Sequence, residues 1–127
     1  MKKLKRDPVK YIRDRAKSKY KKGTECHICG TDTKLDFHHF YSLAPMLREW
    51  LQEKKKERPD HYTDEYIVIW RDEFIEDKWA ELYTHTVTLC HNHHLELHRL
   101  YGRNPALVTA TKQQRWVELQ RDKYGMV

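Results

Sequence analysis

Three cysteines and one histidine form two pairs with the spacing of zinc ligands. Two residues separate Cys26 from Cys29, and two residues separate Cys90 from His93. Two ligands at this spacing on a turn can hold one side of a tetrahedral zinc ion. Three cysteines cannot form a closed set of disulfides, and no β-α-β pattern of a redox pair surrounds the first motif. We therefore expect a structural zinc site of three cysteines and one histidine. Two neighbouring histidines break the spacing and are weaker alternative ligands, namely His27 and His91.

Four further histidines lie in two short segments. His38 and His39 are adjacent in a segment that reads as a strand, so their side chains should point to opposite sides unless the strand bends. His94 and His98 are four residues apart in a segment with helical spacing. Both rings would then lie on one helix face and could chelate one metal ion. Asp36 could orient one of these rings, or it could be a surface residue at the strand edge. The spacing therefore indicates a second metal site.

The apolar pattern predicts several helices around a short pair of strands. One helix should begin at Pro8 and run to Gly23, and a long one should begin after Thr63 and continue to Leu82. The other expected elements are strands at 35–41 and 84–89 and helices at 44–58, 91–101 and 112–124. Core side chains are expected to include Ile67, Trp70, Phe74, Trp79, Trp116 and Leu119. The predicted fold class is α+β and mainly α.

Three motifs follow one another along the chain. They are Cys26-x-x-Cys29, Asp36-Phe37-His38-His39, and Thr88-Leu89-Cys90-x-x-His93-His94-x-x-x-His98. This order resembles the HNH nuclease family, the ββα-metal or His-Me finger nucleases, and in particular its small phage-type members. In that family a histidine pair ends the first strand, and two histidines project from the helix directly after the last zinc ligand. The resemblance does not cover residues 42–83 or the two terminal helices.

The resemblance implies a role for each histidine of the second site. His38, His94 and His98 would bind a catalytic divalent ion, which could be Mg²⁺, Mn²⁺, Ni²⁺ or Zn²⁺. His39 would be the general base that deprotonates the attacking water. His85 stands where the family has its central Asn, which implies a hydrogen-bonding role towards the base. The chemistry agrees, because a neutral imidazole accepts a proton at physiological pH and a divalent ion stabilises the phosphate and the leaving oxygen.

Positive charge is concentrated near the N-terminus. The chain has a net charge of +6, and residues 1–25 carry eleven Lys or Arg against three Asp or Glu. Such a segment suits phosphate backbones, although a solvated helix face or a flexible tail would have the same composition. Residues 42–83 are acidic, with seven Lys or Arg and eleven Asp or Glu. The expected DNA contacts are Lys17, Lys19, Lys21, Lys22, Arg99 and Arg103.

The length favours a single nuclease domain at residues 1–127. Its expected parts are a basic helix at 1–25, a ββα-metal core at 26–41 and 84–102, a helical insertion at 42–83 and a C-terminal helix at 103–127.

The expected activity is hydrolysis of DNA phosphodiester bonds, by nicking or by double-strand cleavage. No apolar run reaches membrane length, so we expect a cytoplasmic protein, in the host cytoplasm if a phage encodes it. The expected partners are DNA and phage packaging or recombination proteins, and monomer and homodimer both remain open. One alternative is a non-catalytic, zinc-stabilised DNA-binding module, which would not need His39, His94 or His98. A protein-interaction domain that uses the acidic insertion is the other.

Overall fold

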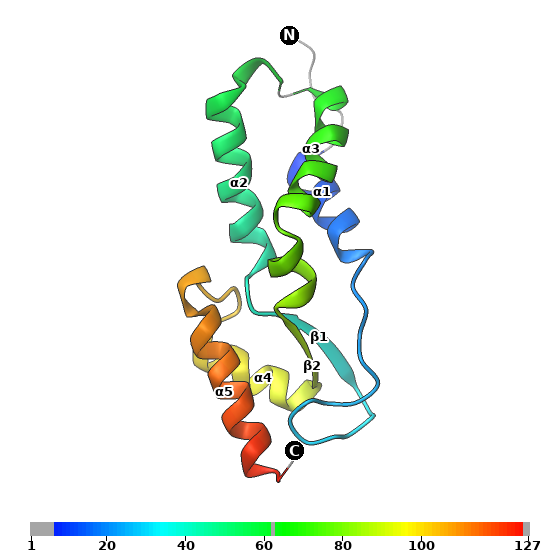
Figure 1. The fold of residues 1–127 in the computed structure, drawn as a ribbon, viewed down its shortest axis with the longest axis vertical. Coiled ribbons are helices and arrows are strands. Elements are labelled where there is room, and N and C mark those ends of the chain that lie inside the picture. Colours follow the sequence, from blue (N-terminus) through cyan, green and yellow to red (C-terminus); the bar gives the residue numbers. More distant parts are fainter. Residues whose placement is uncertain (1–6, 62, 126–127) are drawn as a thin grey trace.

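The computed structural model describes residues 7–61 and 63–125, so the basic residues 1–6 of the predicted N-terminal helix lie outside the described residues. The fold is α+β and mainly α, as predicted. The helices at 8–17, 43–57 and 64–77 lie at one end of an elongated molecule, and the sheet and the helices at 91–101 and 110–123 lie at the other (Figure 1). The elements are α1 (Pro8–Lys17), β1 (Leu35–His39), α2 (Leu43–Glu57), η1 (Pro59–His61), α3 (Asp64–Asp77), η2 (Ala80–Thr84), β2 (Thr86–Cys90), α4 (His91–Tyr101), η3 (Leu107–Thr109) and α5 (Ala110–Lys123).

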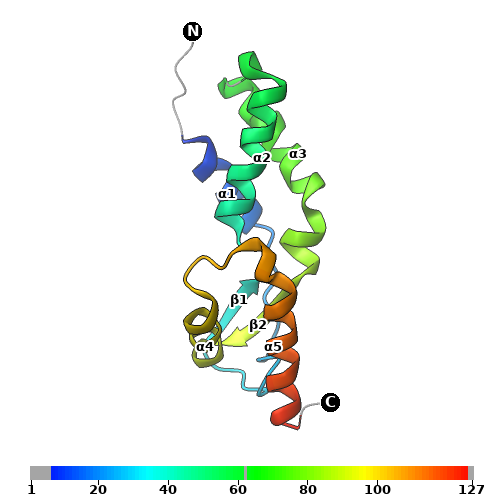
Figure 2. The same cartoon turned by 90° about the vertical axis from the view of Figure 1, so that its left-hand side faces the viewer.

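The two strands pair antiparallel, and their register fixes where the candidate ligands lie. Leu35 pairs with Cys90 at one end of the ladder, and His39 pairs with Thr86 at the other. α4 begins at His91 directly after β2 and contacts both strands (Figure 2). The sheet therefore carries the cysteine of β2 at one end and the histidine pair of β1 at the other.

Two clusters of buried side chains hold the elements together. α1, α2 and α3 enclose the first cluster, whose fully buried members include Ile12, Leu47, Ile67, Trp70 and Phe74. The sheet, α4 and α5 enclose the second, whose members include Ile28, Phe40, Leu89, Leu97 and Val117. None of the described helices is long and apolar enough to cross a membrane.

The first helix is shorter than predicted. It begins as expected, because Pro8 stands in its first turn and the Asp7 carboxylate accepts a hydrogen bond from the Val9 amide at 3.0 Å. It ends at Lys17 and not at Gly23. The following residues run along the sheet instead, where Tyr20 stacks on Phe37 at 4.3 Å between ring centroids. Gly23 donates its amide to Thr88 Oγ1 at 2.7 Å, so contacts with the sheet override the local helical pattern.

The long helix predicted after Thr63 is interrupted. α3 ends at Asp77, and a π-helical turn, η2, covers Ala80–Thr84 before the chain enters β2. A π turn changes the direction in which later side chains point. Leu82, within this turn, lies in the core, whereas Trp79, just before it, is 51% exposed and is not the core residue that the sequence predicted.

The last helix turns a different face to the interior than predicted. Leu119 is 53% exposed, and Trp116 is only half-buried against the second cluster. The inward positions of α5 are Gln113 and Val117, which are 0% and 1% exposed. The prediction placed apolar residues inward, but a glutamine can be buried where its amide is hydrogen-bonded.

Candidate functional site

The three cysteines and His93 meet between the turn at 26–30 and the start of α4. Their four ligand atoms lie within 4.8 Å of one another. Cys90 Sγ lies 3.2 Å from His93 Nδ1, Cys26 Sγ lies 3.8 Å from the same nitrogen, and Cys29 Sγ lies 4.0 Å from Cys90 Sγ. Two sulfurs on one tetrahedral zinc ion lie about 3.8 Å apart, given a Zn–S bond of about 2.3 Å. The donor types and their spacing therefore fit a zinc ion.

The backbone around Cys26 favours the thiolate form of this ligand, whereas burial and the neighbouring thiols raise the pKa of Cys90 to about 11. Burial raises the pKa of the Cys26 thiol, but hydrogen bonds from backbone groups of Cys29, Cys90 and Ile28 lower it more, to about 6. Gly30 makes the tight turn possible with a φ of +76°, and its amide donates to the Cys26 carbonyl at 2.8 Å.

The two alternative ligands belong to other contacts. His27 Nε2 lies 2.7 Å from Glu118 Oε1 on α5, and His91 Nδ1 lies 3.0 Å from Asp36 Oδ2. Neither histidine is part of the four-atom cluster of candidate zinc ligands.

A second cluster joins β1 to α4. His38 Nδ1 lies 3.2 Å from His94 Nε2, which lies 2.9 Å from His98 Nε2. All three nitrogens lie within 4.8 Å of one another. Two nitrogens bound to one divalent ion lie about 3 Å apart, given metal–nitrogen bonds of about 2.1 Å. The spacing fits three ligands of one ion.

The other nitrogen of each ring is already engaged. His94 Nδ1 lies 3.1 Å from Asp36 Oδ2, and His98 Nδ1 donates to the Gly102 carbonyl at 2.8 Å. His38 Nε2 lies 2.9 Å from the Gln113 side-chain oxygen. Carboxylate and carbonyl oxygens only accept, so these outer nitrogens of His94 and His98 carry the protons and their inner nitrogens carry lone pairs. Ligating histidines typically have such outer acceptors. Converging lone pairs are best satisfied by a cation, so the donor set fits a metal ion.

His39 lies next to this cluster in a cavity of about 230 Å³. The same cavity is lined by all three cluster histidines, by Arg13 and Lys17 of α1, by the start of α2, and by residues 103–105. His39 Nδ1 and Arg13 Nε are both buried and have no hydrogen-bond partner among the described residues. Buried polar atoms without partners are uncommon and often mark a functional site.

The strand histidines are held neutral at physiological pH. Burial and, to a smaller extent, the positive charge of Lys17 together lower the pKa of His39 to about 4. Burial also lowers the pKa of His38 to about 3. Neutral imidazoles are the form that binds a metal ion or accepts a proton.

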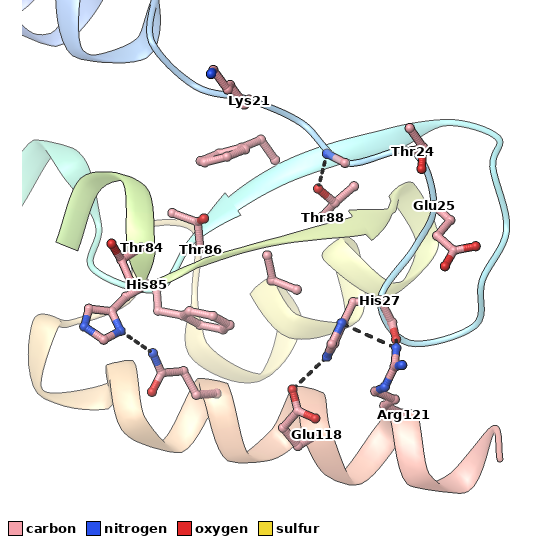
Figure 3. Close-up of a pocket in the computed structure, with 15 residues that line it drawn as sticks. Lys21, Thr24, Glu25, His27, Thr84, His85, Thr86, Thr88, Glu118 and Arg121 are labelled. Atoms are coloured by element: carbon pink, nitrogen blue, oxygen red, sulfur yellow. Dashed lines mark hydrogen bonds and ion pairs between the residues drawn. The ribbon is translucent and has the colours of Figure 1, made fainter. Parts of the chain in front are cut away.

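The His85 ring is not part of this cavity. It points towards α5, where its Nδ1 lies 3.4 Å from Gln114 Nε2, and it lines a separate cavity of about 650 Å³ (Figure 3). Lys21, His27 and Arg121 line that second cavity too. The His85 carbonyl does accept the Phe40 amide at 3.2 Å, so its backbone touches the residue after His39.

Of the six predicted DNA contacts, Lys17 and Arg103 line the histidine cavity. Lys22 Nζ instead donates to the Leu35 carbonyl at 2.9 Å, and Lys19 lies over the exposed Trp79 ring. Arg99 lines a third cavity beside the cysteine cluster.

Two residues at the site were not predicted. Arg13 could have been found, because it lies four residues before Lys17 on the basic helix and therefore on the same face. Gln113 gives no signal in the sequence.

The two clusters define a small α+β protein with a cysteine-rich group and a histidine group that could each hold a metal ion. A family model described as the nicking endonuclease family, and named for phage T5, matches residues 1–126. The chain therefore belongs to this family, which makes it an endonuclease that cleaves DNA. No solved structure gives a significant match to the chain.

Proposed function

We propose that the chain is a metal-dependent HNH endonuclease that nicks DNA, with β1, β2 and α4 as its ββα-metal core. One observation carries the proposal: three imidazole nitrogens converge while their outer nitrogens are engaged elsewhere. A binding module without catalysis would have no need for this arrangement. We take residues 7–61 and 63–125 as parts of one catalytic unit, in which residues 42–83 are an insertion.

Each metal site has a separate task in this proposal. Cys26, Cys29, Cys90 and His93 would hold a structural zinc ion that fixes the start of α4. His38, His94 and His98 would hold the catalytic divalent ion, with Mg²⁺, Mn²⁺, Ni²⁺ and Zn²⁺ as candidates. Bound there, that ion would supply positive charge to the scissile phosphate and to the leaving oxygen.

His39 would act as the general base. Its ring is neutral at pH 7, because its pKa is lowered to about 4, and its Nδ1 makes no competing hydrogen bond within the described residues. A phosphate bound in the cavity would raise this pKa again, since a nearby negative charge favours the protonated ring. The base would therefore become stronger when substrate arrives, and it could take a proton from the attacking water.

Basic side chains around the cavity would hold the DNA backbone. Arg13, Lys17 and Arg103 line the cavity that contains His39, so their charges face the place that a scissile phosphate would occupy. Lys19, Lys21, Lys22 and Arg99 would make more distant phosphate contacts. We assign His85 a positioning role through its carbonyl, which holds the Phe40 amide.

One such site among the described residues suits a cut in a single strand, and two cuts would require a second copy. We propose that the enzyme acts on DNA in the cytoplasm of a phage-infected cell. Phage packaging or recombination proteins are candidate partners there.

Cleavage of supercoiled plasmid tests the proposal. Protein freed of the catalytic ion should convert supercoiled DNA to open circles when Mg²⁺, Mn²⁺, Ni²⁺ or Zn²⁺ is added. His39→Ala should slow this conversion by about 10²- to 10⁴-fold while DNA binding is retained, because proton transfer contributes about that factor. His27→Ala is the matched control, since His27 belongs to neither cluster and its side chain contacts Glu118 of α5. Folded wild-type protein that binds DNA but never cleaves it would instead be the zinc-stabilised binding module.

A further inference from the structure

Gln113 is a polar side chain in the protein interior. It is 0% exposed, and both ends of its amide are hydrogen-bonded. Its oxygen lies 2.9 Å from His38 Nε2. Its nitrogen donates to Thr109 Oγ1 at 2.9 Å and to the Phe40 carbonyl at 3.3 Å. A buried amide needs partners for its oxygen and its nitrogen alike, and Gln113 has them only in this arrangement of α5 and β1.

The surrounding groups decide which way the amide points. The Thr109 hydroxyl donates to the Ala106 carbonyl at 2.6 Å, so only its lone pairs are left for Gln113. The Phe40 carbonyl can also only accept. Both positions require a donor, and a flipped amide would set the Gln113 oxygen against the carbonyl oxygen of Phe40. The amide nitrogen therefore faces these two groups, and the amide oxygen faces His38.

This orientation fixes the tautomer of His38. Because the Gln113 oxygen can only accept, the proton of the neutral His38 ring lies on Nε2. Nδ1 then keeps its lone pair, which faces His94 Nε2 at 3.2 Å. In the opposite tautomer Nδ1 would carry the proton and donate it to His94 Nε2, so neither of these nitrogens would offer a free lone pair to a metal ion.

We propose that Gln113 is a positioning residue that keeps His38 in the tautomer required of a metal ligand. This inference rests on the proposed function, in which His38, His94 and His98 hold a divalent ion. The same amide holds the Phe40 carbonyl, one residue after His39, so it also fixes the end of β1. α5 thereby belongs to the catalytic site, although it lies outside the two strands and the helix that carry the histidines.

The test compares wild type with Gln113→Met, which keeps the length of the side chain and removes the amide. Long-range ¹H–¹⁵N spectra of histidine-labelled protein, with zinc at the cysteine site and no second metal, report which nitrogen of His38 carries the proton. Wild type should show the proton on Nε2, and Gln113→Met should show a mixture or the opposite tautomer. Calorimetric titration with Ni²⁺ should show an affinity about 10- to 100-fold lower for Gln113→Met.

Two further variants separate this role from a structural one. Gln120→Met makes the same exchange two helical turns further along α5. Within the described residues the Gln120 side chain has no hydrogen bond to the histidines, so this control should leave the His38 tautomer and the Ni²⁺ affinity unchanged. Thr109→Val leaves Gln113 in place and removes one of the two acceptors that orient its amide, together with the hydrogen bond from the Thr109 hydroxyl to the Ala106 carbonyl. It should weaken Ni²⁺ binding a few-fold even if Gln113→Met proves too unstable to purify.

A wild-type tautomer and wild-type Ni²⁺ affinity in both Gln113→Met and Thr109→Val would overturn the proposal, whatever happens to the melting temperature. Failure of wild-type protein to bind Ni²⁺ would count against the proposed nuclease site, while the tautomer of His38 would still decide the role of Gln113.

Discussion

The neutral state of His39 makes stability depend on pH in a way that one substitution can isolate. The ordinary pKa of histidine is 6.5, and in the folded protein that of His39 is lowered to about 4. Between these values the unfolded chain binds a proton at this position and the folded protein does not. Stability therefore falls as the pH is lowered, because protons then favour the unfolded state. Above pH 6.5 both states are neutral and the effect disappears.

The size of this effect follows from the same values. A pH of 5 lies about 1.5 units below the ordinary pKa of 6.5. Each unit below that pKa lowers the free energy of unfolding by about 1.4 kcal/mol, as long as the folded protein stays unprotonated. His39 should then lower the free energy of unfolding by about 2 kcal/mol at pH 5, and by almost nothing at pH 7. His39→Gln removes the titrating group. When the pH is lowered from 7 to 5, the free energy of unfolding of this variant should therefore fall by about 2 kcal/mol less than that of wild type.

Urea unfolding of the zinc-loaded proteins at pH 7 and pH 5, followed by circular dichroism, measures this difference. The comparison cancels the acid sensitivity of the cysteine site, because both proteins share it. Lys17→Gln should reduce the pH effect of His39, since the Lys17 charge contributes to the lowered pKa. Equal losses in wild type and His39→Gln would refute the view that His39 is buried in its neutral form and ready to accept a proton.

Two more predictions concern the cysteine site and the basic rim of the cavity. Cys26→Ser should bind zinc far more weakly and unfold at a lower temperature, because a serine hydroxyl replaces a thiolate ligand; unchanged zinc content by atomic absorption would argue against Cys26 as a ligand. Arg13→Met should lower kcat/KM for plasmid nicking by about 10- to 100-fold, which is the worth of a hydrogen bond to a charged group, and should reduce the salt dependence of DNA binding. Lys19→Met, which lies outside the cavity, is its control, and an equal effect of both substitutions would mean that Arg13 contributes only general charge.

The parts of the site that the sequence predicted are those governed by short spacings. Two intervening residues bring Cys26 to Cys29 and Cys90 to His93, and a helical period brings His94 to His98, whatever the rest of the chain does. The meeting of β1 with α4 was expected from the resemblance, and the structure brings His38 to the helix pair. Local periodicity also gave the fold class and the beginnings of most helices.

The parts that were missed depend on contacts between distant segments. From the sequence, a glutamine on a polar helix is predicted to be a surface residue. Gln113 is buried because its amide hydrogen-bonds to His38 and Phe40, which lie far away in the chain. The early end of α1 depends on Thr88, which binds the Gly23 amide across 65 positions. The His85 ring points to α5 because a π turn precedes β2, and nothing in its immediate neighbours predicts that turn.

The acidic insertion can serve the site without touching DNA. The insertion begins just after β1 and ends just before β2. His39, the last residue of β1, pairs with Thr86, the first residue of β2. The ends of the insertion are therefore already close together, so the added helices cost the core little closure entropy.

The insertion also supports the basic helix. α1 packs against α2 and α3, Arg71 donates to the Tyr11 hydroxyl at 2.8 Å, and the Tyr83 hydroxyl donates to the Ala16 carbonyl at 2.9 Å. The second bond joins η2 to the residue next to Lys17, on the turn of α1 nearest His39. Without the insertion α1 would lose most of its packing surface, and Arg13 and Lys17 would no longer be held at the cavity. In the proposed mechanism, an acidic segment that contacts no phosphate would thus be needed to hold the basic residues that contact the scissile phosphate.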